Sequence, residues 1–175
     1  MLLGATGCTH RIWLTQDLRE DYELGVIDGE VASADTTAKH SAAELQYFIA
    51  DRVVLQRQVS GRSDDVARGR IRVRQGRFVD TVVIPRGTPG IAAVVETGAL
   101  QISFEEGSAF TFMPNERTGI YELQTVEGEG EWPTIEVDGE FYWVQRGARA
   151  QLRVRREDRM QHSFRRRAMK GRRLD

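Results

Sequence analysis

Hydrophobic and polar residues alternate through most of the chain between residues 69 and 155, which is the spacing expected for half-buried β-strands. The alternating runs are short and end at glycine-containing turns such as Gln75-Gly76, Thr97-Gly98 and Asp138-Gly139. The segment "PRGTPG" at 85–90 combines two prolines with two glycines, a composition typical of tight turns. We expect about eight or nine strands at hairpin spacing, the pattern of a small barrel or sandwich.

The amino-terminal part of the chain follows a different pattern. In "LTQDLREDYEL" (14–24) apolar residues recur four positions apart, which predicts a short helix capped by Thr15. The segment "SAAE" at 41–44 has the form of a capping box and predicts another turn or two of helix. Apolar residues at strand spacing in 47–57 then predict a strand with a bulge near Asp51-Arg52.

These patterns together predict a mainly β fold, a small antiparallel barrel or sandwich with one or two short N-terminal helices and a basic C-terminal tail. We divide the chain into a remnant of a signal segment (1–8), a short helix and tether (9–40), a mostly β domain (41–157) and the tail (158–175). The tail has many charges and few apolar anchors, so we expect it to be mobile.

Three strongly charged blocks underlie the net charge of −1. Residues 52–86 hold nine arginines and three acidic residues, whereas residues 96–140 hold eleven acidic residues and a single arginine. The last 21 residues hold nine basic and three acidic residues. Blocks of this kind are usually solvated faces or interaction surfaces. The tail contains a candidate basic interaction arm, formed by Arg165, Arg166, Arg167, Lys170, Arg172 and Arg173.

No combination of residues in the sequence predicts catalysis or metal binding. The histidines His10, His40 and His162 lie outside the predicted β core, and none has a partner at metal-ligand spacing. Glu105 and Glu106 are adjacent, so on one strand they would point to opposite faces and could not act together on a substrate. We therefore predict a protein that is not an enzyme, with no catalytic residues, no metal site and no cofactor.

Cys8 is the single cysteine of the chain and directly follows the small residues Ala5-Thr6-Gly7. This box resembles the end of a bacterial lipoprotein signal peptide, and the resemblance implies that Cys8 is the site of lipid attachment. A signal peptide also needs a basic segment and an apolar stretch of roughly 7–15 residues, which Met1-Leu2-Leu3 does not supply. Either the true start lies upstream, or the chain has been trimmed, or Cys8 is an ordinary cysteine in a frayed terminus.

Two longer stretches also carry resemblances. The segment "VVIPRGTPGIAAVVETGALQISFEEG" (82–107) resembles a Src-homology-3-like small barrel, a fold that serves many unrelated functions. Six pieces together resemble a family of uncharacterised bacterial lipoproteins: Cys8, "LTQDLREDYEL", "AELQYFIADRVVLQRQV", "VVIPRGTPGIA", "ALQISFEEG" and "FYWVQRGARAQLRV". This second resemblance implies a location rather than an activity.

The sequence leaves two functions open. The first is a non-enzymatic lipoprotein of the bacterial cell envelope, held at the membrane through Cys8, with a β domain that binds a protein or anionic envelope partner or has a structural role. Thr9 follows the cysteine, with no aspartate there to favour the inner membrane, so we expect the outer membrane. The alternative is a cytoplasmic nucleic-acid-binding small barrel that uses residues 52–86 and the arginine-rich tail.

Overall fold

The computed structural model describes residues 10–23, 26–27, 30–31, 41–59, 71–74, 77–127, 130, 132–137 and 139–155. Its helical elements are an α-helix and a single 3-10 turn: α1 (Gln16–Glu23) and η1 (Ala42–Glu44). Its strands are β1 (Arg11–Trp13), β2 (Val26–Ile27), β3 (Glu30–Val31), β4 (Tyr47–Ile49), β5 (Val53–Val59), β6 (Ile71–Arg74), β7 (Arg77–Ile84), β8 (Pro89–Glu96), β9 (Ala99–Glu105), β10 (Ser108–Pro114), β11 (Tyr121–Leu123), β12 (Thr134–Val137), β13 (Glu140–Arg146) and β14 (Leu152–Arg155).

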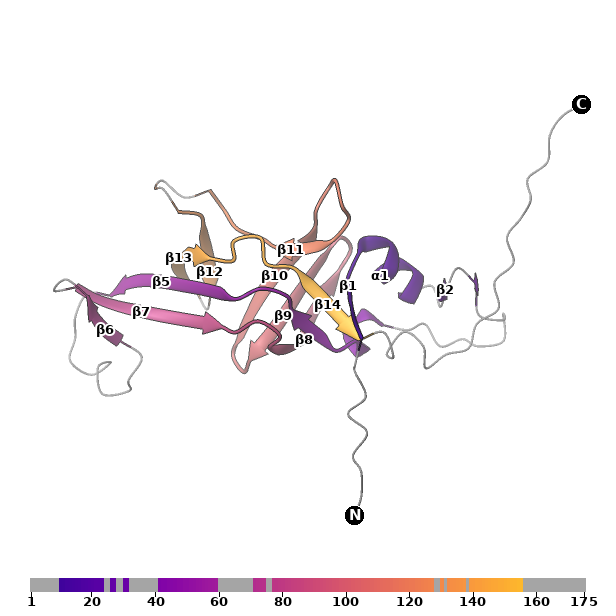
Figure 1. Ribbon diagram of the computed structural model, residues 1–175, viewed down its shortest axis with the longest axis horizontal. Coiled ribbons are helices and arrows are strands. Elements are labelled where there is room, and N and C mark those ends of the chain that lie inside the picture. Colours follow the sequence, from indigo (N-terminus) through magenta and orange to yellow (C-terminus); the bar gives the residue numbers. More distant parts are fainter. Residues whose placement is uncertain are drawn as a thin grey trace, which may run out of the picture.

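The strands form two main antiparallel sheets, which confirms the predicted mainly β fold (Figure 1). The larger sheet has seven strands in the order β1-β14-β4-β8-β9-β10-β11, and the smaller has five in the order β12-β13-β5-β7-β6. Strands β2 and β3 form a separate hairpin. Neither main sheet closes into a barrel. Isolated bridges and backbone hydrogen bonds connect the β11 end of the larger sheet to the chain next to β1 and β14: Thr15 bridges to Ile120, and Glu122 to Gln151.

Four segments of the chain pass from one sheet to the other. The predicted bulge at Asp51-Arg52 is the bend between β4 and β5, and the "PRGTPG" turn joins β7 to β8. The third crossing leads from β11 to β12. The fourth, between β13 and β14, bends at Gly147, which has a φ of +80°. A Cβ at this glycine would lie 2.7 Å from the carbonyl oxygen of Arg52, so the crossing needs a residue without a side chain. Through these crossings the five-stranded sheet extends away from the larger one (Figure 1).

The predicted N-terminal helix is confirmed as α1, which packs on the hydrophobic core. The Thr15 hydroxyl accepts a hydrogen bond from the backbone N–H of Leu18 at 3.1 Å, so Thr15 caps the helix. The capping residue Ser41 accepts from the N–H of Ala43 at 3.2 Å and begins the 3-10 turn. The largest fully buried side chains come from both sheets and from the segment before α1: Leu14, Tyr47, Ile49, Val53, Leu55, Leu100, Ile102, Phe112, Tyr121, Val144 and Leu152.

Strand β1 belongs to the folded domain. Strand β1 pairs with β14 along the edge of the larger sheet, and Leu14 is fully buried directly after it. Residues 11–23, which we had assigned to a helix and tether, are therefore part of the folded domain. Much of the remaining segment to residue 40, like residues 1–8 and 158–175, lies outside the described residues. Among the helices described, none is long and apolar enough to cross a membrane.

Candidate functional site

The site residues predicted from the sequence lie beyond the described part of the chain. This is true of Cys8 and of the whole basic arm, Arg165, Arg166, Arg167, Lys170, Arg172 and Arg173. His10 is described and exposed, whereas His40 and His162 are not described. Within the described ranges, no group of three histidine, cysteine, aspartate or glutamate residues is placed to hold a metal ion.

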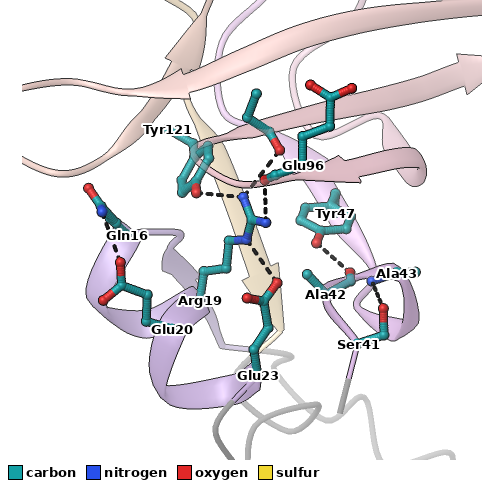
Figure 2. Close-up of polar contacts among 11 residues, drawn as sticks. Gln16, Arg19, Glu20, Glu23, Ser41, Ala42, Ala43, Tyr47, Glu96 and Tyr121 are labelled. Carbon is teal, nitrogen blue, oxygen red and sulfur yellow. Dashed lines mark hydrogen bonds and ion pairs between the residues drawn. The ribbon is translucent and has the colours of Figure 1, made fainter. Parts of the chain in front are cut away.

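The most buried charged side chain in the described part of the chain is Arg19 of α1, which is 5% exposed. Figure 2 shows its guanidinium reaching from the helix to the β8–β9 turn and to β11. It donates to the carbonyl oxygen of Glu96 at 2.6 Å, to that of Ala99 at 3.1 Å and to the hydroxyl of Tyr121 at 2.9 Å. Its Nε also pairs with the carboxylate of Glu23 at 3.0 Å.

These contacts give the Arg19 cluster a structural role. Burial lowers the pKa of the Arg19 guanidinium, but the hydrogen bonds to Glu23 and Tyr121 outweigh burial and leave the pKa raised. The arginine therefore stays charged. Burial also raises the pKa of Tyr121, although the charge of Arg19 opposes that shift. Because the donors of Arg19 are used within the domain, we interpret the cluster as the attachment of α1 to the sheet rather than as a ligand site.

A groove of about 610 Å³ lies between β7 and the β9–β10 hairpin, where the two sheets meet. Its volume falls within the usual range for small-molecule pockets. Its wall includes apolar side chains from both sheets, among them Val82, Ile84, Phe104, Phe110 and Val137. Three acidic residues also line it, Asp80, Glu105 and Glu106, and its lining contains no lysine or arginine. The groove therefore combines an apolar wall with negative charge.

A polar network closes one end of the groove. Arg57 pairs through Nε with Asp80 at 3.1 Å and through Nη1 with Glu140 at 2.6 Å. The hydroxyl of Tyr142 donates to the same Asp80 oxygen at 3.0 Å. Burial, followed by this bond and the charge of Asp80, raises the pKa of Tyr142. Since Asp80 is held by two partners, the arrangement is suited to binding and positioning rather than to acid–base exchange.

Glu105 and Glu106 both contribute to the lining of this groove. Glu105 ends β9, whereas Glu106 already belongs to the β9–β10 turn. The alternation of a strand, on which the expectation of opposite faces depended, therefore does not extend to Glu106.

The ion pairs of Arg57 reduce the free positive charge of the basic block at residues 52–86. Its side chain is mostly buried and paired with two carboxylates, so its charge is compensated within the domain. Arg52 and Arg86 are exposed, at the β4–β5 bend and at the β7–β8 turn respectively. The block therefore supplies fewer available charges than the sequence suggested.

No protein-family model matches this chain, and neither a curated protein nor a solved structure matches it.

Proposed function

We propose that this protein is a non-enzymatic, lipid-anchored protein of the bacterial cell envelope, in which Cys8 carries the lipid and the β domain provides a binding surface. One observation supports this assignment above the others. A single cysteine stands behind a lipobox-like stretch, and only Thr9 and His10 separate it from strand β1. An acyl chain at Cys8 would hold the β domain directly against the membrane surface.

The binding role rests on the groove between the sheets. Arg57 compensates the charge of Asp80, so Glu105 and Glu106 supply the negative charge of the groove. Together with the apolar residues of its lining, they favour a ligand that has both apolar and positively charged parts. We place the domain at the outer membrane, on its periplasmic or surface side, because Thr9 gives no aspartate signal for the inner membrane.

The anchor is tested with the gene expressed from its own locus, with its native upstream DNA and a C-terminal tag. Detergent phase partitioning and mass spectrometry of the amino-terminal peptide follow the protein. The wild type should enter the detergent phase with an acylated Cys8, and Cys8→Ala should move it to the aqueous phase even at low salt. The control is the tail variant Arg165→Glu, Arg166→Glu, Arg167→Glu, which keeps Cys8 and should stay in the detergent phase.

Two results would overturn the proposal. One is a Cys8→Ala protein that remains in the detergent phase, and the other is a wild-type Cys8 that carries no lipid. In either case the cytoplasmic nucleic-acid-binding alternative becomes the leading function.

A further inference from the structure

The outer face of the β1–β14 pair carries three arginines and a tryptophan. Antiparallel register places Arg11 opposite Arg155 and Trp13 opposite Arg153. Directly opposite residues share one face of a sheet, and residues two apart on a strand share it as well. The four side chains therefore form one surface, which we call the Arg–Trp patch (Arg11, Trp13, Arg153 and Arg155).

The three guanidiniums lie over aromatic rings. Arg11 is 3.7 Å from the centroid of the Phe48 ring, and Arg155 is 5.5 Å from the same ring. Arg153 is 3.8 Å from the Trp13 ring. Stacking of this kind fixes a guanidinium while its edge remains able to donate hydrogen bonds. Within the part of the chain that the structure describes, none of the three arginines forms an ion pair with a carboxylate.

Exposed apolar groups accompany these charges. Trp13 is 39% exposed. Phe48 lies opposite Pro89 of β8, so Ile91, two residues further along, is on the same outer face, where it is 63% exposed. Tryptophan is enriched where a protein meets the headgroup region of a membrane, and arginine is attracted to the phosphates of anionic lipids. The patch offers both kinds of contact on one face.

The position of the patch decides between lipid and other phosphate-bearing partners. Cys8 and Arg11 are three residues apart, a span of at most about 10 Å when extended. A lipid at Cys8 would thus keep the patch within reach of the headgroups. We infer that the Arg–Trp patch is the membrane-facing surface of the domain, with its arginines on the phosphates of anionic phospholipids and Trp13 and Ile91 in the interface. This inference rests on the proposed anchor for its choice of a membrane over a nucleic acid.

The test uses the full chain with Cys8→Ser, so that no acyl chain contributes. Trp132→Phe and Trp143→Phe are added at two exposed positions, which leaves Trp13 as the single tryptophan. The probe is a vesicle of phosphatidylcholine in which roughly a third of the lipid is brominated phosphatidylglycerol, since bromine quenches an inserted indole while the anionic headgroup recruits arginine. We expect Trp13 to be quenched by these vesicles and not by brominated phosphatidylcholine alone.

Two sets of charge variants locate the binding surface. Neutralising the patch should weaken vesicle binding about fivefold for each arginine, or roughly 100-fold for all three. The patch variant is Arg11→Gln, Arg153→Gln, Arg155→Gln. The matched control is Arg52→Gln, Arg146→Gln, Arg149→Gln, which removes the same charge from three exposed arginines that line a separate pocket at the β13–β14 turn. This control should retain most of the vesicle binding. A lysine version of the patch should also retain it, and circular dichroism checks that each variant is folded.

The outcomes separate this inference from the anchor. Equal loss in the patch and control variants, or unquenched Trp13 on bound vesicles, would overturn the inference even if Cys8 proves to be acylated. Quenching that depends on the patch would support it even if Cys8 proves to carry no lipid. Binding of a single-stranded oligonucleotide that excludes vesicles and is lost in the same patch variant would replace the membrane with a nucleic acid as the partner.

Discussion

Arg19→Met is the substitution that tests how α1 is held on the β domain. Methionine keeps much of the side-chain length and the helix propensity of arginine, so the change removes mainly the charge and the hydrogen bonds. Arg19 makes four such bonds, two of them to carbonyl oxygens at the β8–β9 turn, one to the Tyr121 hydroxyl and one to Glu23. Few other side chains in the described ranges connect three elements in this way.

The expected cost follows from the groups left behind. The substitution leaves the buried Tyr121 hydroxyl and two part-buried carbonyl oxygens without a charged donor. A fully buried polar group left unsatisfied costs about 1–3 kcal/mol, and a part-buried one costs less. Glu23 is about one-third exposed, so water compensates most of its loss. The bonds to Glu96 and Ala99 share one guanidinium and are not additive, so we expect Arg19→Met to lower the free energy of unfolding by about 3–5 kcal/mol.

Urea denaturation followed by circular dichroism measures this loss. With a slope of about 2 kcal/mol per molar, the midpoint should fall by roughly 2 M. Arg19→Lys keeps the charge but has a single nitrogen in place of the guanidinium fork, so it should recover only part of the loss. Arg117→Met, at an exposed turn, is the matched control and should change the free energy by less than about 0.5 kcal/mol.

The reasoning fails if Arg19→Met costs less than about 1 kcal/mol, because the carbonyls would then have found other partners. It also fails if the lysine variant is as stable as the wild type, since charge alone would then hold the helix. A double-mutant cycle with Tyr121→Phe should show a coupling energy of about 0.5–3 kcal/mol. If the cycle shows no coupling energy, the bond between Arg19 and Tyr121 does not contribute to stability.

Three further predictions concern other parts of the domain. Gly147→Ala should cost about 1–3 kcal/mol more than Gly98→Ala in urea denaturation, because both glycines have positive φ but only the Cβ at Gly147 meets a backbone oxygen. Asp80→Asn should lower the pKa of Tyr142 in an ultraviolet titration, because the charge of Asp80 disappears, while burial keeps that pKa above its ordinary value. Burial raises the pKa of Tyr47 above the value of about 10 that it has in the unfolded chain. The free energy of unfolding should therefore fall as the pH rises above about 10, because the unfolded state loses its proton first, and Tyr47→Phe should make this fall less steep.

Local patterns in the sequence carry most of the information about the elements of this fold. Period-2 alternation and glycine turns predict the hairpins from β6 to β13, and the capping pattern at Thr15 predicts α1. The same rules say little about which sheet a strand joins. The segment from 47 to 57 is predicted as one bulged strand, yet the bend at Asp51-Arg52 divides it between two sheets. Long-range pairing decides this, and it depends on residues far apart in the sequence.

Amphipathic alternation does not predict which aromatic residues of β13 are buried. Residues of β13 alternate as expected, but Phe141 and Trp143 point outward and are 66% and 44% exposed, whereas Tyr142 is buried between them. Large apolar residues are usually assigned to the core, so a strand with aromatic residues on both faces gives no local signal of which face is inside.

Local sequence patterns also gave little indication of where the important arginines lie in the fold. Arg19 stands among acidic residues, which is typical of a solvated helix face, but it is three positions before Tyr22 and so shares the buried side of α1. That spacing was a usable signal. The patch at Arg11 and Arg153 had no such signal, because each arginine alternates with buried residues in its own short strand. The antiparallel register of β1 and β14 brings Arg11 and Arg153 onto one face, although they are far apart in the sequence. Arg11 is also only three residues from Cys8. The surface nearest the proposed anchor is therefore formed by strand pairing. Substitutions that preserve charge but break the β1–β14 pairing should reduce binding to anionic vesicles as completely as loss of the arginines themselves.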